Sequence, residues 1–177
     1  MAEAPAPSPA MTPRRFAPSL PYLGAGLLAL ILVVPGFVYP YLFDDYDFLV
    51  RALRFAPSQL LPDPSILFYR PVSRELYFAL LQTLSPRGPL LGHALNALAL
   101  VAASCLVVWI GTRGLGRREG ALAGIYFAAL GQIPLLVAWV SGAQDAFAIL
   151  FTLAAIALEW RRRHFAALIA AALAVLS

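Results

Sequence analysis

The chain has 177 residues, of which 61% are hydrophobic and only 12% are charged, and its mean hydropathy is +0.78. Soluble globular proteins carry about 25% charged residues, so this composition excludes an ordinary soluble domain and predicts a membrane protein. All 13 basic residues are arginine and the formal net charge is +4. The arginines form short clusters between apolar runs, which is typical of membrane topology signals and argues against nucleic acid as a partner.

The first 21 residues are rich in Pro and Ala, and we expect residues 1–21 to form a flexible cytoplasmic segment. Residues 22–39 are the first apolar run. A secretory signal peptide is the alternative interpretation of this run. Because Tyr39-Pro40-Tyr41 stands where a cleavage site of small residues would be needed, we favour an uncleaved transmembrane helix.

Residues 40–88 form a hydrophilic section that we expect to be an outer loop. Apolar residues recur at helical spacing over 45–55 and again over 73–84. Prolines separate these two pieces, and charged residues interrupt both of them. The pattern predicts two amphipathic helices that lie on the membrane face, the first carrying an ion pair between Asp47 and Arg51.

Further apolar runs predict an all-α, polytopic membrane bundle. The last run has 13 residues, which reach about 20 Å at a rise of about 1.5 Å per residue, short of a hydrocarbon core of about 30 Å. We therefore expect residues 22–177 to be the N-terminal part of a larger transmembrane domain, truncated within its fifth helix. The expected spans are 22–39, 89–111, 119–139, 145–160 and the incomplete 165–177.

The arginine clusters predict the orientation of the chain. Short basic loops stay in the cytoplasm, so the N-terminus is expected there, and the loop 40–88 and the turn 140–144 are expected on the outer face. The absence of Lys and the abundance of Ala and Arg are typical of a GC-rich bacterial source. We therefore expect an integral protein of a bacterial inner membrane with its active site on the periplasmic or extracellular side.

Acidic side chains gather on the expected outer face. Three of the nine acidic residues, Asp44, Asp45 and Asp47, fall within four positions, and Asp145 follows the outer turn. Acids at membrane depth are costly and are functional candidates. Of these, Asp44, Asp45 and Asp145 could hold a divalent metal such as Mg or Mn, or one carboxylate could act as a general base.

Arg70 and Arg74 could bind a phosphate group through forked hydrogen bonds. Each candidate has an alternative role that the sequence leaves open. The two acids at helix starts, Asp44 and Asp145, could cap those helices, and the two arginines could be interfacial residues. The other polar or aromatic candidates have structural alternatives: His93 and Asn96 as hydrogen-bonding packing residues, and Trp139 as an interfacial anchor.

Four segments follow the first apolar run in a recognisable order. They are Phe43-Asp44-Asp45, Tyr69-Arg70-Pro71-Val72-Ser73, Gly92-His93-Ala94-Leu95-Asn96, and Ala138-Trp139-Val140-Ser141-Gly142 with Asp145 downstream. Their order resembles the membrane GT-C glycosyltransferases, and most of all their protein O-mannosyltransferase-like branch, over residues 22–163. Relatives often carry a His-Pro-x-His element before the Trp, of which this chain keeps only Pro134.

The resemblance implies an inverting glycosyltransferase that uses a polyprenyl-phosphate-linked sugar, with mannose suggested by the branch. It assigns Asp44 as the catalytic acid of the family and Asp45 as the second member of its pair, with Asp145 as a further outer-loop acid. Tyr69 and Arg70 match the segment to which we assign binding of the donor phosphate. The acceptor would be a protein, lipid or glycan hydroxyl, and the fragment is expected to be inactive alone. The alternatives are a non-catalytic membrane scaffold or assembly subunit and a transporter fragment.

Overall fold

The computed structural model describes residues 19–62 and 69–177, and within these ranges helices are the only regular secondary structure. The all-α class expected from the sequence is therefore confirmed for this part of the chain. Most of the N-terminal segment expected to be flexible, residues 1–18, lies outside the described residues.

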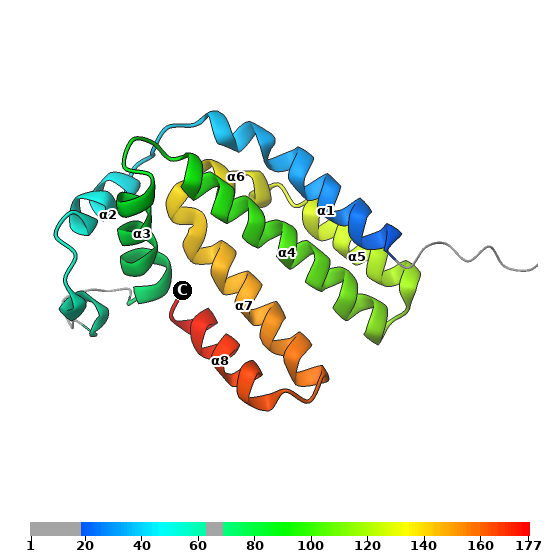
Figure 1. The fold of residues 1–177 in the computed structure, drawn as a ribbon. Coiled ribbons are helices and arrows are strands. Elements are labelled where there is room, and N and C mark those ends of the chain that lie inside the picture. Colours follow the sequence, from blue (N-terminus) through cyan, green and yellow to red (C-terminus); the bar gives the residue numbers. More distant parts are fainter. Residues whose placement is uncertain (1–18, 63–68) are drawn as a thin grey trace, which may run out of the picture.

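Three apolar stretches are long enough to cross a membrane, as far as the described residues show, and they make this chain consistent with a membrane protein. The first is α1 (Leu20–Val33) with the 3-10 turn Val34–Val38, and the second is α4 (Leu90–Gly114). The third is α7 (Ala143–Trp160) with the 3-10 turn Val140–Gly142 before it, called η4 below. The shorter apolar helix α8 (His164–Val175) packs back along α7 (Figure 1).

The run over 119–139, expected as one span, is a bent pair of helices that together are long and apolar enough to cross a membrane only as one broken span. Helix α5 (Arg117–Ala128) and helix α6 (Gln132–Ala138) meet at an angle of 50°. Pro134 explains the break, because its ring would clash with the carbonyl group of Leu130 inside a continuous helix. In the observed structure Pro134 lies in the first turn of α6, where its missing N–H would have no helical partner.

Three short elements lie together beyond the ends of the long helices (Figure 1). Helix α2 (Asp45–Ala52) starts where the sequence predicts and ends three residues earlier than expected. A 3-10 turn (Pro57–Leu60) follows it. The second expected helix is a π-helical segment (Pro71–Leu76) that continues into α3 (Tyr77–Leu84).

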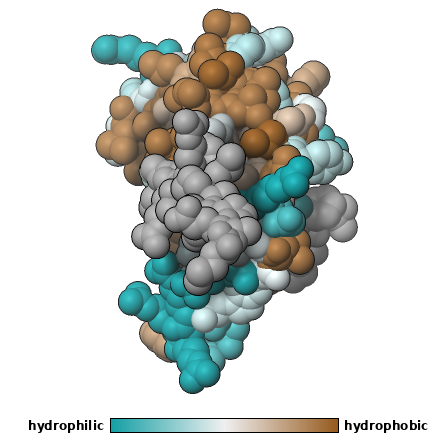
Figure 2. Space-filling model, turned by 90° about the vertical axis from the view of Figure 1, so that its right-hand side faces the viewer, coloured by the Kyte–Doolittle hydropathy of each residue, from teal (hydrophilic) through white to brown (hydrophobic). Residues whose placement is uncertain are grey.

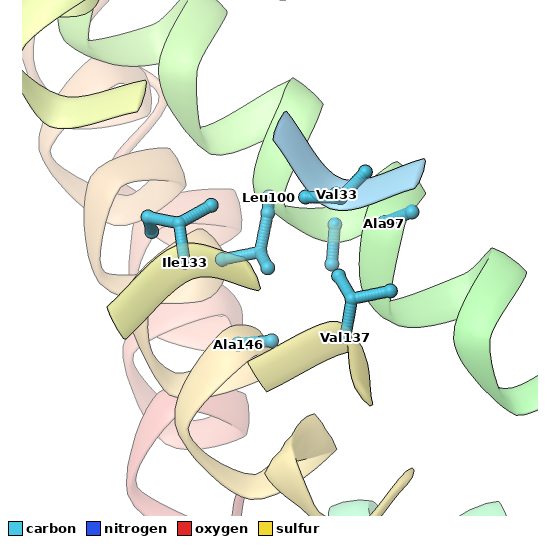
Figure 3. Packing of buried hydrophobic residues seen from close by; sticks show 7 residues of the cluster. Val33, Ala97, Leu100, Ile133, Val137 and Ala146 are labelled. Atoms are coloured by element: carbon cyan, nitrogen blue, oxygen red, sulfur yellow. The ribbon is translucent and has the colours of Figure 1, made fainter. Parts of the chain in front are cut away.

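Two apolar clusters hold these parts together. One joins α1, α4, α6 and α7, and its buried side chains interlock in Figure 3. The other joins α3 to η4 and the start of α7 through Tyr77, Phe78, Leu81, Val140 and Ala143. Helices α4 and α5 approach closely, because a Cβ added to Gly120 would come within 2.3 Å of the Thr112 nitrogen. The segment 136–142 lies between the two clusters, and the candidate site is built against it.

Candidate functional site

The backbone turns sharply just before the acidic pair. Phe43 has a φ of 45°, a left-handed conformation that is rare for an aromatic residue and costs local strain. Asp44 follows at the N-cap position of α2, yet its side chain makes no capping hydrogen bond. The capping role left open by the sequence is therefore not adopted by Asp44, whose carboxylate is turned toward another part of the chain.

The Asp44 carboxylate binds the segment before α7. Its Oδ1 accepts hydrogen bonds from the Trp139 indole Nε1 at 2.9 Å and from the Ser141 hydroxyl at 3.0 Å. The side chain is half-buried, and its Oδ2 accepts no hydrogen bond from the residues that the structure describes. One oxygen is thus held in a fixed direction, while the lone pairs of the other are not used by the described residues.

Asp45 is fully buried and binds backbone N–H groups. Its Oδ1 accepts from the Ser141 N–H at 2.7 Å, and its Oδ2 accepts from the N–H groups of Leu42 at 2.8 Å and Val140 at 3.3 Å. Burial raises the pKa of the Asp45 carboxyl, while these hydrogen bonds act in the opposite direction. Asp45 therefore ties the start of α2 to η4 and positions its neighbour Asp44.

Asn96 holds the same segment from the side of α4. Its Nδ2 donates to the carbonyl oxygens of Leu136 at 2.9 Å and Val140 at 3.0 Å, and its Oδ1 accepts from the Tyr77 hydroxyl at 2.9 Å. The pKa of Tyr77 is raised well above its ordinary value, first by burial and then by the negative charge of Asp45. Tyr77 accordingly stays protonated and remains a hydrogen-bond donor to this network.

His93 lies one helical turn before Asn96 and is also fully buried. Its Nδ1 lies 2.5 Å from the Val137 carbonyl oxygen, and its Nε2 lies 2.9 Å from the Tyr39 carbonyl oxygen. Carbonyl oxygens only accept hydrogen bonds, so the protonated ring nitrogen is the donor in either tautomer. His93 thereby links the end of the first apolar stretch to α6 within the packed interior.

Arg70 and Asp145 meet at the first turn of α7. Arg70 Nη1 donates to the Gln144 side-chain oxygen at 2.8 Å and lies 3.9 Å from Asp145 Oδ1. Gly142 occupies the N-cap position, so Asp145 does not cap α7, although its charge is favoured by the helix dipole. Within the described residues no hydrogen bond or ion pair joins Asp145 to the Asp44–Asp45 pair.

The other two residues expected at the donor phosphate have different surroundings. Arg74 is buried, binds the Glu75 carboxylate at 2.7 Å and lies over the Phe48 ring at 5.7 Å. The Tyr69 hydroxyl donates to the Leu60 carbonyl oxygen at 2.5 Å. Of the three candidates, Arg70 is the one placed beside the segment that binds Asp44.

One expected ion pair does not form. Asp47 and Arg51 are both exposed on α2, and no ion pair between them occurs among the residues described. An exposed pair of this kind contributes little stability in water, so either side chain is free to extend into solvent.

The acidic residues do not assemble into a metal site. Over residues 19–62 and 69–177, no group of three His, Cys, Asp or Glu side chains could hold a metal ion. Both oxygens of Asp45 already accept backbone N–H groups, and a cation there would have to displace them. The Mg or Mn ion expected at Asp44, Asp45 and Asp145 therefore stays a prediction, with Asp45 bound to backbone N–H groups and Asp145 beside Arg70.

Sequence reasoning did not identify two residues of the site as ligands of Asp44. Trp139 was expected only as an interfacial anchor, and Ser141 carried no assigned role. Both belong to the segment Ala138-Trp139-Val140-Ser141-Gly142, which contributed to the resemblance. This motif was the feature of the sequence that could have indicated their place in the site. Comparison with protein-family models, curated proteins and solved structures finds no match for the chain.

Proposed function

We propose that this chain forms part of a membrane glycosyltransferase of the GT-C type, which moves a sugar from a polyprenyl phosphate to an acceptor hydroxyl. The observation that carries the proposal is the Asp44 carboxylate, which is half-buried and held through one oxygen while the other oxygen is available. A general base needs this combination of fixed direction and open lone pair.

The reaction is an inverting displacement. The acceptor hydroxyl oxygen forms a bond to the anomeric carbon of the sugar as the bond from that carbon to the phosphate oxygen breaks. Asp44 Oδ2 takes the hydroxyl proton, and the polyprenyl phosphate leaves with the electron pair of the broken bond. The donors Trp139 and Ser141 keep Asp44 aimed at the hydroxyl throughout.

Arg70 is the residue we assign to the leaving phosphate. It is held by Gln144 and Asp145, three and four residues after Ser141, so the start of α7 carries contacts to both the base and the cation. The Arg70 side chain is 34% exposed, so part of it faces solvent. A guanidinium at this place would stabilise the negative charge that develops on the phosphate during transfer.

The proposed location is the outer face of a bacterial inner membrane. Helix α2 bears exposed apolar side chains at Tyr46, Val50 and Leu53, next to Phe43, which is 82% exposed. Such a surface suits a helix that lies at the membrane interface beside the site. The lipid-linked donor would then approach along the membrane, and a protein, lipid or glycan acceptor would approach from water.

The test is Asp44→Asn introduced into the chromosomal gene of the source organism. Membranes are supplied with a radiolabelled polyprenyl-phosphate mannose, and transfer of label to acceptors is measured at equal protein level. We expect Asp44→Asn to lower transfer at least about 100-fold, the lower end of the contribution of a general base. Asp47→Asn, which changes an exposed acid on the same helix, serves as the control and keeps full transfer. Undiminished transfer by Asp44→Asn would instead favour a non-catalytic membrane scaffold.

A further inference from the structure

Two arginines converge on one tryptophan at the end of the bundle away from the acidic site. The guanidinium carbon of Arg113 lies 4.9 Å from the centre of the Trp109 ring, and that of Arg161 lies 5.1 Å from it. Neither arginine has a carboxylate partner within the described residues, and the nearby Glu159 is bound to His164 at 2.9 Å. Two exposed positive charges are therefore held against one ring, without a carboxylate partner among the described residues.

An apolar groove leads away from these charges. A cavity of about 390 Å³ is lined by Arg161, Trp109, Tyr22 and Cys105, together with apolar residues of α4 and α7. A second cavity, of about 650 Å³, shares Tyr22 and Cys105 and continues between α1 and α4. Together the two cavities form one groove that begins at a basic end and is apolar beyond it.

The dimensions of this groove match a lipid chain. It borders α4 from Trp109 back to Ala94, a distance of about 22 Å at a rise of about 1.5 Å per residue. One leaflet of a bilayer contributes about 15 Å of the hydrocarbon core, so an extended acyl chain can fill most of the groove. The three helices that form its walls, α1, α4 and α7, all belong to stretches long enough to cross a membrane.

The side of the molecule on which the basic end of the groove lies is divided by polarity. Figure 2 faces the side of the molecule on which α4 and α7 end, with hydrophobic surface in its upper part and hydrophilic surface in its lower part. The turn between α7 and α8 lies near the bottom of Figure 1 and so belongs to the hydrophilic part. An occupant of the groove therefore meets water and positive charge at one end and apolar surface along its length.

We infer that this groove is a binding site for an anionic phospholipid. The phosphate accepts hydrogen bonds from Arg113 and Arg161, and one acyl chain follows the groove along α4. The charge of the two arginines selects an anionic headgroup over a zwitterionic one, because a choline or ethanolamine group would add a positive charge beside them. This inference does not depend on the chemistry at Asp44.

The experiment uses the full chain in nanodiscs that contain phosphatidylglycerol or phosphatidylcholine with dibrominated acyl chains. Bromine quenches tryptophan fluorescence at contact, and Trp109 lines the groove. At equal mole fraction we expect brominated phosphatidylglycerol to quench more strongly, with an apparent affinity at least about 10-fold higher than that of phosphatidylcholine. Each arginine near a charged headgroup raises the binding affinity about fivefold. The double variant Arg113→Gln/Arg161→Gln should therefore remove the preference for phosphatidylglycerol.

Arg118→Gln provides the matched control, because Arg118 is exposed in the first turn of α5 and does not line the groove. It should keep the preference for phosphatidylglycerol. Equal quenching by the two lipids in the unmodified chain would overturn the inference without any substitution. An equal loss of preference in Arg118→Gln and in the double variant would also overturn it, since a diffuse charge effect would then suffice. Protection of Trp109 by a second copy of the chain, seen as a dimer by native mass spectrometry, would show a different occupant.

Discussion

Replacing Asp45 tests the network that positions the site. The buried Asp45 carboxylate accepts three backbone N–H groups, at 2.7, 2.8 and 3.3 Å. Asp45→Ala leaves all three without an acceptor, and each buried, unpaired N–H costs about 1–3 kcal/mol. Since these costs are not additive and water can enter the vacated space, we expect a total loss of about 3–5 kcal/mol of unfolding free energy. That loss is a large part of the ~5–15 kcal/mol by which a domain is stable.

Asp45→Asn separates the hydrogen bonds from the volume of the side chain. An amide oxygen in place of Oδ2 keeps the bonds from Leu42 and Val140, while the NH2 group faces the Ser141 N–H and loses that bond. One lost acceptor predicts a cost of about 1–3 kcal/mol. Unfolding in mixed micelles with increasing SDS, followed by tryptophan fluorescence, measures both values. Asp47→Ala, on the exposed side of α2, is the control, with an expected change within about 0.5 kcal/mol. A loss in Asp45→Ala no larger than that of the control would refute the reasoning.

Three further predictions concern the same region. Gly92→Ala places a Cβ 2.6 Å from Val140 Cγ1 and should cost about 1–3 kcal/mol of stability. Gly88→Ala, whose added Cβ would have nothing within 4 Å, should be neutral, and equal melting temperatures of the two variants would contradict the prediction. Burial raises the pKa of Asp45 above its ordinary 3.8, so its contribution to stability is complete below that pH and is lost as the pH rises through the raised value. The unmodified chain should therefore lose stability relative to Asp45→Asn between about pH 4 and the raised pKa. If the unfolding free energies of the two proteins changed in parallel with pH, a raised pKa of Asp45 would be excluded. Trp139→Phe removes the indole donor to Asp44 and should lower sugar transfer about 10-fold with little change in melting temperature, the loss expected for a hydrogen bond to a charged group; unchanged transfer would show that this bond does not orient the base.

The helices could be predicted well because their signals are local. The apolar faces of α2 and α3 and the long apolar runs of α1, α4 and α7 follow from residue spacing alone. The break between α5 and α6 was missed, although Pro134 marked the place, because a proline near the end of a helical run is compatible with both a continuous and a broken helix.

The contacts of the acidic pair could not be predicted from residue spacing. Asp44 and its partners Trp139 and Ser141 are 95 and 97 positions apart in the sequence. Aspartate before a helix is commonly an N-cap, so the local sequence favours that role for Asp44. Only the tertiary packing of α6 and η4 shows where its side chain points. The resemblance named the segments that carry these contacts. It did not indicate that both oxygens of Asp45 accept backbone N–H groups, or that Asp145 lies beside Arg70.

The rate of sugar transfer by Asp44→Asn over a range of donor concentrations tests the central proposal most directly. If Asp44 is the general base, kcat falls by at least about 100-fold, while KM for the polyprenyl-phosphate sugar stays within about threefold, because the base contributes to the chemical step and not to donor binding. Asp47→Asn, measured alongside at equal protein level, keeps both constants. A kcat for Asp44→Asn equal to that of the unmodified protein would contradict the assignment of Asp44 and the glycosyltransferase mechanism built on it.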